Sequence, residues 1–591
     1  MRRARPAVVV LAVLGVLLAG CTGVPSDSAP MVIKTVPIGG EDGQAPATTP
    51  APGIGPNTLV SDFLQANALD ASEQTSPRGF LSSAARNSWS DTTVTVIDSP
   101  TVRFYSARHH SVTVTGRVLG TVDATGVYTP TLLGADSEEA QFVYGVRLVG
   151  GQYRITSLRN GLLLSEADFT SYYTPRPVYY YDLAHRYLVP DPRWTSLTDP
   201  TQLADFLMNG LTRSSPSDEI SNSVSNDTLP ARAAASGRIN VTVGSTTKIE
   251  IPGSSQLGAT NRNRLAEQVS ATLAGVPRTE RLELTDGGKP VTIPAVHGTI
   301  FVAADFSART EPPQPPPDVY FLRSGKVYGQ EALGQNAVRL KGAVNGSYFL
   351  QSVAVAQDKQ QGTNAVAGTA GRSSSQLRLL VGTQSGGLRQ TTVRGPLTRP
   401  AFAPGRSEVW VGDGDRLYLV EVDNEKKTQH VERIGLPSAA GDGRIVALRL
   451  SPDGSRIALV IRGANGAQQL FVAAVVRAGG QVTLGQQLQQ VSPDGVLIQD
   501  VAWAEPLKLV AIGYNPHTLE HHVYDVGSDG SSFTTQSTGN LPGVPSFLAV
   551  AVRQPIWVTA NRGVWQQEAG NTWVSPGAGL QTDGYAPVYL E

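Results

Sequence analysis

The sequence predicts a multidomain protein with two N-terminal α+β domains followed by an all-β propeller of five or six blades. In the first half of the chain, apolar residues at helical spacing precede stretches in which apolar and polar residues alternate, a pattern typical of α+β domains. In the second half, a strand that ends in a small residue and a turn recurs about every fifty residues, as in a propeller. The 61 glycines and 40 prolines suit the many tight turns of such a fold.

Residues 1–20 have the pattern of a secretory signal. A short apolar run, Ala7 to Ala19, follows three arginines, Arg2, Arg3 and Arg5. A basic start and a short apolar stretch are typical of a signal peptide, whereas a membrane-spanning helix needs about 20 apolar residues. The run ends next to Cys21, which is the only cysteine of the sequence.

The tetrapeptide Leu18-Ala19-Gly20-Cys21 resembles the lipobox of bacterial lipoproteins. The resemblance implies cleavage between Gly20 and Cys21 and lipidation of Cys21 with S-diacylglycerol and an N-palmitoyl (palmitate) group. Several acyl chains anchor a protein firmly, since each buried methylene contributes about 0.8 kcal/mol. We therefore expect the protein on the outer face of the cell membrane, held by its lipid anchor. The alternative is an ordinary signal peptide with a chance cysteine.

Residues 21–57 are predicted to be the acylated cysteine and a flexible linker. The stretch is rich in proline, glycine and threonine and has too few apolar residues for a core. Without the signal segment, acidic residues slightly outnumber basic ones along the chain. Nucleic-acid binding needs a clustered basic surface, so we expect no nucleic-acid partner.

Residues 58–175 are predicted to form the first α+β domain, with helices packed on one antiparallel sheet. Helical spacing relates Leu59, Val60, Phe63, Leu64 and Ala68, and then Phe80, Leu81, Ala84, Ala85 and Trp89. Alternating strands follow at Val94/Val96, Val102/Phe104, Val112/Val114 and Phe142/Tyr144/Val146. The pattern is similar to that of nuclear-transport-factor-like or cystatin-like folds.

Residues 176–305 are predicted to form the second α+β domain. A strand at residues 178–181 returns through a hairpin at residues 188–190, and Asp199-Pro200 indicates an N-cap and first turn of a helix that ends at Gly210. A second helix is expected from Thr260 to Ala274. This order of elements resembles the GerMN domain of sporulation and germination proteins. Five tyrosines are expected to cover the seam between the two α+β domains: Tyr172, Tyr173, Tyr179, Tyr180 and Tyr181.

Residues 306–318 are predicted to be a stiff, Pro-rich joint, and residues 319–591 the β-propeller. The repeated strand ends are marked by Ala356, Ala403, Ser451 and Ala504, which are 47, 48 and 53 residues apart. The turn at residues 451–455, Ser-Pro-Asp-Gly-Ser, resembles that of TolB-like and WD-type blades. The early strand at residues 319–322 is expected to complete the last blade and close the ring.

No catalytic or metal-binding pattern stands out in the sequence. His517, His521 and His522 include a spacing of four, but their flanks predict a turn and a strand instead of the helix such a metal site needs. Residues 245–248 match Ser-x-x-Lys, but the match falls between two predicted strands. Asp413-Gly414-Asp415 is interpreted as a hairpin turn. We therefore expect no catalytic residues, no metal, no cofactor and no enzymatic activity.

Five tryptophans lie in or near the predicted propeller strands: Trp410, Trp503, Trp557, Trp565 and Trp573. Packing inside and between the blades is the favoured interpretation for most of them. The alternative is that some of them anchor a partner at a propeller face.

The order of signal, linker, α+β domain, GerMN-like domain, Pro-rich joint and propeller resembles the LpqB family of actinobacterial lipoproteins over nearly the whole chain. The resemblance implies an accessory of a two-component system that binds the extracytoplasmic domain of an MtrB-type sensor histidine kinase. It would modulate signalling in cell-envelope homeostasis and division.

Two other functions stay open. One is binding or cleavage of envelope polymers in the propeller channel, which a cluster of buried carboxylates at the channel mouth would favour. The other is an envelope scaffold with several partners.

Overall fold

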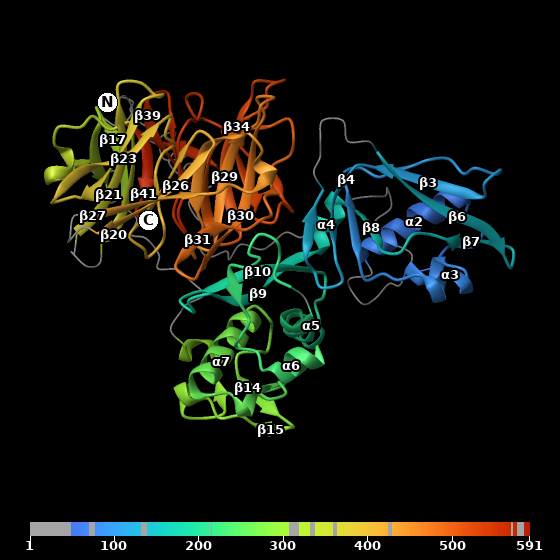
Figure 1. Ribbon diagram of the computed structural model, residues 1–591. Coiled ribbons are helices and arrows are strands. Elements are labelled where there is room, and N and C mark those ends of the chain that lie inside the picture. Colours follow the sequence, from blue (N-terminus) through green and yellow to red (C-terminus); the bar gives the residue numbers. More distant parts are fainter. Residues whose placement is uncertain are drawn as a thin grey trace, which may run out of the picture. The chain divides into compact units, whose positions relative to one another are not determined.

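The computed structural model describes residues 49–69, 77–131, 139–213, 215–306, 318–330, 337–358, 363–423, 428–568, 571–575 and 584–591. These residues form two N-terminal α+β domains, blue and green in Figure 1, and a C-terminal β-propeller in yellow to red. The predicted fold class is confirmed. The signal segment, Gly20 and Cys21, most of the linker and most of the Pro-rich joint lie outside the described residues.

The first domain contains two four-stranded sheets, with orders β5-β4-β1-β8 and β2-β3-β6-β7. The strands are β1 (Val94–Ile97), β2 (Thr101–Val102), β3 (Ser111–Gly116), β4 (Val118–Val122), β5 (Tyr128–Pro130), β6 (Ala140–Val149), β7 (Gln152–Ser157) and β8 (Leu162–Ser165). The helices are α2 (Pro56–Leu69), α3 (Ser83–Ser88) and α4 (Glu166–Tyr172), with a 3-10 turn η2 (Pro77–Phe80).

The expectation of one antiparallel sheet in this domain is wrong. There are two sheets, and β1 and β8 pair in parallel, with Val94 opposite Leu162. The three consecutive leucines of β8 are all buried. A strand that is apolar on both faces is typical of a parallel, doubly covered position, not of a half-exposed antiparallel one.

Aromatic side chains fill the core between α2 and the sheets. The Phe63 ring lies 5.8 Å from the ring centroids of Trp89 and Tyr144 and 6.3 Å from that of Phe80, all edge to face. Such pairs add about 0.5–1.5 kcal/mol to the burial of each ring. The apolar spacing recognised in the sequence therefore marks the residues that hold helix and sheet together.

The second domain starts with the hairpin of β9 (Thr174–Asp182) and β10 (Leu188–Thr195). The remaining elements are α5 (Pro200–Arg213), β11 (Val224–Ser225), α6 (Ala231–Ser236), β12 (Asn240–Thr242), β13 (Thr247–Glu250), α7 (Ala259–Leu273), β14 (Leu282–Asp286), β15 (Lys289–Pro290) and β16 (Ile300–Phe301). The predicted cap of α5 is confirmed, because Asp199 Oδ1 accepts the N–H groups of Thr201 and Gln202, both at 2.9 Å.

The helix α5 continues past Gly210 to Arg213, so the predicted helix end is wrong. Gly210 faces β9, and a Cβ atom added there would lie 3.4 Å from Val178 Cγ1. The glycine thus permits close helix–strand packing, and it does not terminate the helix.

The predicted tyrosine seam is also wrong for the tyrosines of β9. Tyr180 is part of the core of the second domain, and the Tyr181 hydroxyl donates to Glu267 Oε2 of α7 at 2.8 Å. Tyr172 and Tyr173 pack instead against the core of the first domain. Trp194 of β10 does join the two domains, because its ring belongs to the first domain's core.

Six sheets, five of them four-stranded and one five-stranded, form the propeller in the part of the chain that the structure describes. The first sheet contains β41 (Gly584–Tyr589), β17 (Val319–Arg323), β18 (Lys326–Gln330) and β19 (Val338–Arg339). The second contains β20 (Ser352–Asp358), β21 (Thr363–Gly371), β22 (Leu377–Thr383) and β23 (Gly387–Gly395). The third is β24 (Ala401–Phe402), β25 (Glu408–Asp413), β26 (Arg416–Asp423), β27 (Thr428–Ile434).

The fourth is β28 (Arg444–Leu450), β29 (Arg456–Arg462), β30 (Gln468–Ala478) and β31 (Gln481–Leu484), with β32 (Gln489–Gln490) also on β30. The fifth contains β33 (Leu497–Glu505), β34 (Lys508–Tyr514), β35 (His521–Gly527) and β36 (Phe533–Gln536). The sixth contains β37 (Leu548–Ala549), β38 (Trp557–Ala560), β39 (Gly563–Glu568) and β40 (Thr572–Val574).

The ring closes as the sequence predicts. The first strand of the domain, β17, pairs with the last one, β41, so that Val319 lies opposite Tyr589. The inner strands β41, β20, β24, β28, β33 and β37 contact one another around the ring. Trp410, Trp503, Trp557 and Trp573 are buried in the blades, which confirms their predicted packing role.

Two faces and a channel of the propeller as candidate binding sites

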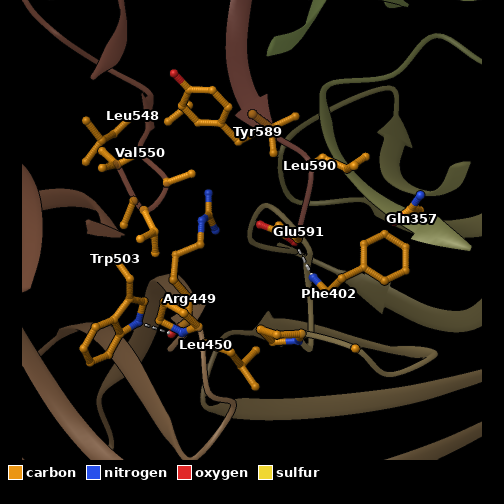
Figure 2. A pocket seen from close by; sticks show the side chains of 18 of the residues that line it. Gln357, Phe402, Arg449, Leu450, Trp503, Leu548, Val550, Tyr589, Leu590 and Glu591 are labelled. Carbon is orange, nitrogen blue, oxygen red and sulfur yellow. Dashed lines mark hydrogen bonds between the residues drawn. The ribbon is translucent and has the colours of Figure 1, made fainter. Parts of the chain in front are cut away.

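A cavity of about 200 Å³ lies where the six inner strands end (Figure 2). Its walls are mainly apolar and include Phe402, Leu450, Trp503, Leu548, Val550 and Leu590. The polar side chains among the described lining residues include Gln357, Arg449 and Glu591. We call this end of the propeller, with the loops that follow the inner strands, the docked face.

Glu591 is the one acidic side chain among the described residues that line this cavity. The Phe402 N–H donates to its Oε2 at 2.5 Å, a contact drawn in Figure 2. Burial raises the pKa of Glu591 to about 7, against the opposing effect of Arg449. A second buried carboxyl group, that of Asp500, lies 4.0 Å from Arg449 and accepts a hydrogen bond from Arg399.

The interior of the channel is tied together by Arg399. Its guanidinium donates to Asp500 Oδ2 at 2.8 Å, to the Leu548 carbonyl at 2.7 Å and to the Pro587 carbonyl at 2.9 Å. The Leu548 N–H in turn donates to Asp500 Oδ2 at 3.0 Å. These partners come from three blades other than that of Arg399. A buried, charge-assisted network of this kind fixes the blades relative to one another.

The second α+β domain contributes to the cavity through the turn of its β9–β10 hairpin. Tyr187 lines the cavity, and Arg186 Nη2 donates to the Gly405 carbonyl at 3.1 Å. Gly405 has φ +64°, and a Cβ atom added there would lie 2.7 Å from the Tyr187 hydroxyl. Asp182 Oδ1 holds the turn by accepting the N–H groups of Arg186 and Tyr187. The docked face is therefore shaped to receive this turn.

All eight residues of β10 are buried. Trp194 lies near its end, and its ring centroid is 4.8 Å from that of Phe169 in the first domain. The Trp194 Nε1–H donates to Asp529 Oδ2 in a propeller loop at 2.7 Å. One side chain thus joins all three domains.

A buried ion pair lies beside this tryptophan contact. Arg456 of β29 donates to Glu219 Oε1 at 2.9 Å and to the Pro190 carbonyl of β10 at 2.5 Å. Both charged side chains are almost completely buried. Ser528 Oγ donates to the same Glu219 oxygen at 3.4 Å. Nothing in the local sequence pattern signals these contacts, because they join residues more than 200 positions apart.

The opposite end of the propeller, where the inner strands begin, has a different surface, which we call the open face. Its loops expose large apolar side chains: Tyr348, Phe349, Leu519 and Val544. Phe349 and Val544 precede the inner strands β20 and β37, and Leu519 lies in the turn between β34 and β35. Phe349 is 60% exposed and Leu519 is 71% exposed. Exposed apolar side chains on one face make that face a candidate protein interaction site.

The other patterns of the sequence have structural roles in the described part of the chain. His521 and His522 lie on β35 after a turn that contains His517, so the histidines do not share a helix face. Tyr514 stacks on His521 at 4.9 Å. Residues 245–248 run from the turn after β12 into the start of β13, and Asp413-Gly414-Asp415 joins β25 to β26 as a hairpin. No group of three or more metal-ligating side chains occurs among the described residues.

Two family models match the chain. One, described as the Lipoprotein LpqB beta-propeller domain, matches residues 329–589, and the other, described as Lipoprotein LpqB, N-terminal domain, matches residues 49–170. Together they span well over half of the sequence.

Relatives match over nearly the whole length. A protein named Lipoprotein LpqB from Corynebacterium jeikeium (strain K411) is 27% identical over 567 residues, which cover 94% of this chain and 92% of that protein. One of the same name from Mycobacterium tuberculosis (strain CDC 1551 / Oshkosh) is 27% identical over 608 residues, or 98% of each chain. A structure of TolB from Acinetobacter baumannii is similar at 13% identity and a TM-score of 0.32, over 46% of this chain and 66% of that one.

Fold and matched models define the class as a lipoprotein in which α+β domains precede a C-terminal β-propeller. The family name implies association with a membrane through a lipid anchor. Within the described ranges, every helix is too short or too polar to cross a bilayer. The chain belongs to the LpqB family of lipoproteins.

Proposed function

We propose that this protein is an extracytoplasmic accessory lipoprotein, anchored on the outer face of the membrane, that binds the sensor domain of an MtrB-type histidine kinase. In this role it acts by binding and not by catalysis, and it modulates two-component signalling in cell-envelope homeostasis and division. Its membership of the LpqB family and the lipobox at Leu18 to Cys21 support the proposal.

The observation that carries the proposal is the open face of the propeller. Phe349 and Leu519 expose most of their side chains to solvent on this face. Apolar anchors at the centre of an interface typically contribute most of its affinity. The docked face is occupied by the β9–β10 hairpin, so the open face is the one available to a protein partner.

Binding is sufficient to alter signalling. A kinase that exchanges between two conformations changes its activity when a partner has unequal affinity for the two. A broad, rigid propeller face can distinguish two arrangements of a sensor domain without any chemical step. The sign of the effect follows from which conformation binds more tightly.

The direct test is calorimetry between the purified sensor domain and the mature chain from Thr22 onward, made without the acyl group. We expect saturable one-to-one binding. The double variant Phe349→Ser, Leu519→Ser should weaken it at least tenfold, in line with losses of about 1–2 kcal/mol for each anchor.

Val338→Ser is the matched control. Val338 is also strongly exposed, but it lies on β19, the outermost strand of its blade, and not on the open face. It should leave the affinity unchanged. Absence of binding to a folded sensor domain would contradict the proposal and favour the polymer-binding or scaffold function. Equal affinity of the double variant would reject the open face as the site.

A further inference from the structure

An edge of the first domain combines exposed apolar side chains with positive charge. It consists of two segments, residues 103–110 after β2 and the β6–β7 hairpin at residues 147–154, which we call the basic-apolar edge. Phe104 is 92% exposed and Leu148 is 62% exposed, and Val149 beside it is also exposed. An aromatic ring so completely surrounded by water costs solubility and is generally found where it contacts something else.

The two segments lie side by side. The Val146 N–H donates to the His110 carbonyl at 2.7 Å. The rings of Tyr105 and Tyr153 lie 6.3 Å apart, and the Tyr105 hydroxyl is 3.1 Å from His110 Nδ1. The two segments that carry the exposed apolar residues are therefore in contact with each other.

The charge of this edge is of one sign. Its sixteen residues include Arg103, Arg108, Arg147 and Arg154, together with His109 and His110, and contain no aspartate or glutamate. Arg108 and Arg147 are exposed, while Arg103 forms an exposed ion pair with Glu139 at 3.3 Å. In a chain whose acidic and basic residues nearly balance, a local excess of arginine indicates an anionic partner.

The edge lies where the chain enters the folded domain after its linker. Asn57, at the start of α2, accepts the Tyr105 N–H at 2.9 Å and donates to the Arg103 carbonyl at 3.1 Å. The segment that carries Phe104 is therefore held beside the second residue of α2. Among the described helices, α2 is the first, and it follows in sequence the stretch that connects to Cys21.

We propose that the basic-apolar edge contacts an anionic phospholipid surface. Phe104 and Leu148 insert between the lipid headgroups, and Arg108 and Arg147 pair with the phosphates. Amphipathic surfaces that combine Phe or Leu with arginine bind anionic membranes in this way. The inference rests on the proposed anchoring at the outer face of the membrane, and it adds a second contact that orients the first domain on the bilayer.

Sedimentation with vesicles tests the proposal without the acyl anchor. The mature chain from Thr22 onward, unacylated, is mixed with vesicles of equal parts phosphatidylglycerol and phosphatidylcholine, or of phosphatidylcholine alone. We expect binding to the anionic vesicles only, lost as salt rises from about 0.05 M to about 0.5 M, where the Debye length falls below roughly 5 Å. The variants Phe104→Ser, Leu148→Ser and Arg108→Gln, Arg147→Gln should each lower the partition coefficient about tenfold.

Phe349→Ser on the open face is the matched control, because it also removes an exposed phenyl ring and should leave vesicle binding unchanged. Equal binding to both kinds of vesicle, or unchanged binding of the edge variants, would overturn the proposal. If the edge variants lose affinity for the sensor domain and keep vesicle binding, the edge is instead a protein interface. If only this inference is wrong, the chain binds the kinase sensor domain but not the vesicles. The two proposals can therefore fail independently of each other.

Discussion

The two faces of the propeller use opposite chemistry. On the docked face, charged groups are buried and paired, as in the contact of Arg456 with Glu219. On the open face, apolar side chains such as Phe349 and Leu519 are exposed. Buried charges suit a contact formed once, during folding, whereas exposed apolar groups suit a partner that binds and leaves. The docked face therefore belongs to the folded architecture, and the open face is the one that we propose for a partner.

The buried charges on the docked face act mainly through the cost of separating them. Transfer of a carboxylate or guanidinium out of water costs several kcal/mol, which a well-placed partner offsets. An arrangement of the domains that left Glu219 or Arg456 without its partner would carry this cost in full. The pair therefore favours one arrangement of β10 on the propeller over others.

The largest expected effect on this comparison comes from Arg456→Met. It leaves Glu219 buried without its cation, and losses of about 3–5 kcal/mol are typical of such a change. We expect a lower urea midpoint for unfolding, followed by tryptophan fluorescence, and faster amide exchange in β10. The loss should be smaller at pH 5 than at pH 8, because Glu219 can then be protonated.

Arg462→Met provides the control from the same strand. Arg462 ends β29 and is exposed, with Gln468 Oε1 as its hydrogen-bond partner at 2.8 Å. It should change the midpoint little. The double variant Arg456→Met, Glu219→Gln should recover much of the stability. A failure to recover would show that the arginine acts through packing and not through its charge.

The sequence predicts the repeats of the propeller well, for a local reason. Each blade is a meander of neighbouring strands whose apolar residues and turn signals recur, and the period is visible in Ala356, Ala403 and Ser451. The closing strand β17 is predicted for the same reason, since a strand without a blade of its own remains before the first repeat. The cap at Asp199 is also local, because one side chain and the next three residues define it.

The junction between domains could not be predicted in this way. Trp194 contacts Phe169, 25 positions before it, and Asp529, 335 positions after it. No periodicity links such residues, and the tyrosines of β9, which were expected at the seam, pack inward because their strand is covered by α7. The sequence of β10 gives one indication of the junction, because the apolar residues Leu188, Val189 and Trp194 flank the charged residues Asp191 and Arg193. In the structure the whole strand is buried, and the two charged side chains form an ion pair.

A smaller and pH-dependent effect is expected from Glu591→Gln on the docked face. The pKa of this carboxyl group is raised from 4.5 to about 7 in the folded protein, mainly by burial. Between these two pH values the folded chain keeps a proton that the unfolded chain releases, so the carboxyl lowers stability as pH rises, and the loss is complete above about pH 7. Glutamine stays neutral at every pH.

The stability difference between this variant and the unchanged protein should therefore grow in favour of the variant from pH 5 to pH 8, by at most about 3 kcal/mol. Thermal unfolding of both proteins across this range measures it. Because all other titrating groups are shared, their pH dependence cancels in the difference. A constant difference would show that Glu591 is already ionised at pH 5.

The smallest effect on stability is expected on the open face. Phe349→Ser and Leu519→Ser remove side chains that are mostly in water, so each should change the free energy of unfolding by less than about 0.5 kcal/mol. If either substitution destabilises the propeller as strongly as Arg456→Met does, the open face is part of the folded architecture and the contrast between the faces fails. If both leave the unfolding transition in place and still weaken binding of the kinase sensor domain, these apolar side chains are kept exposed for a partner.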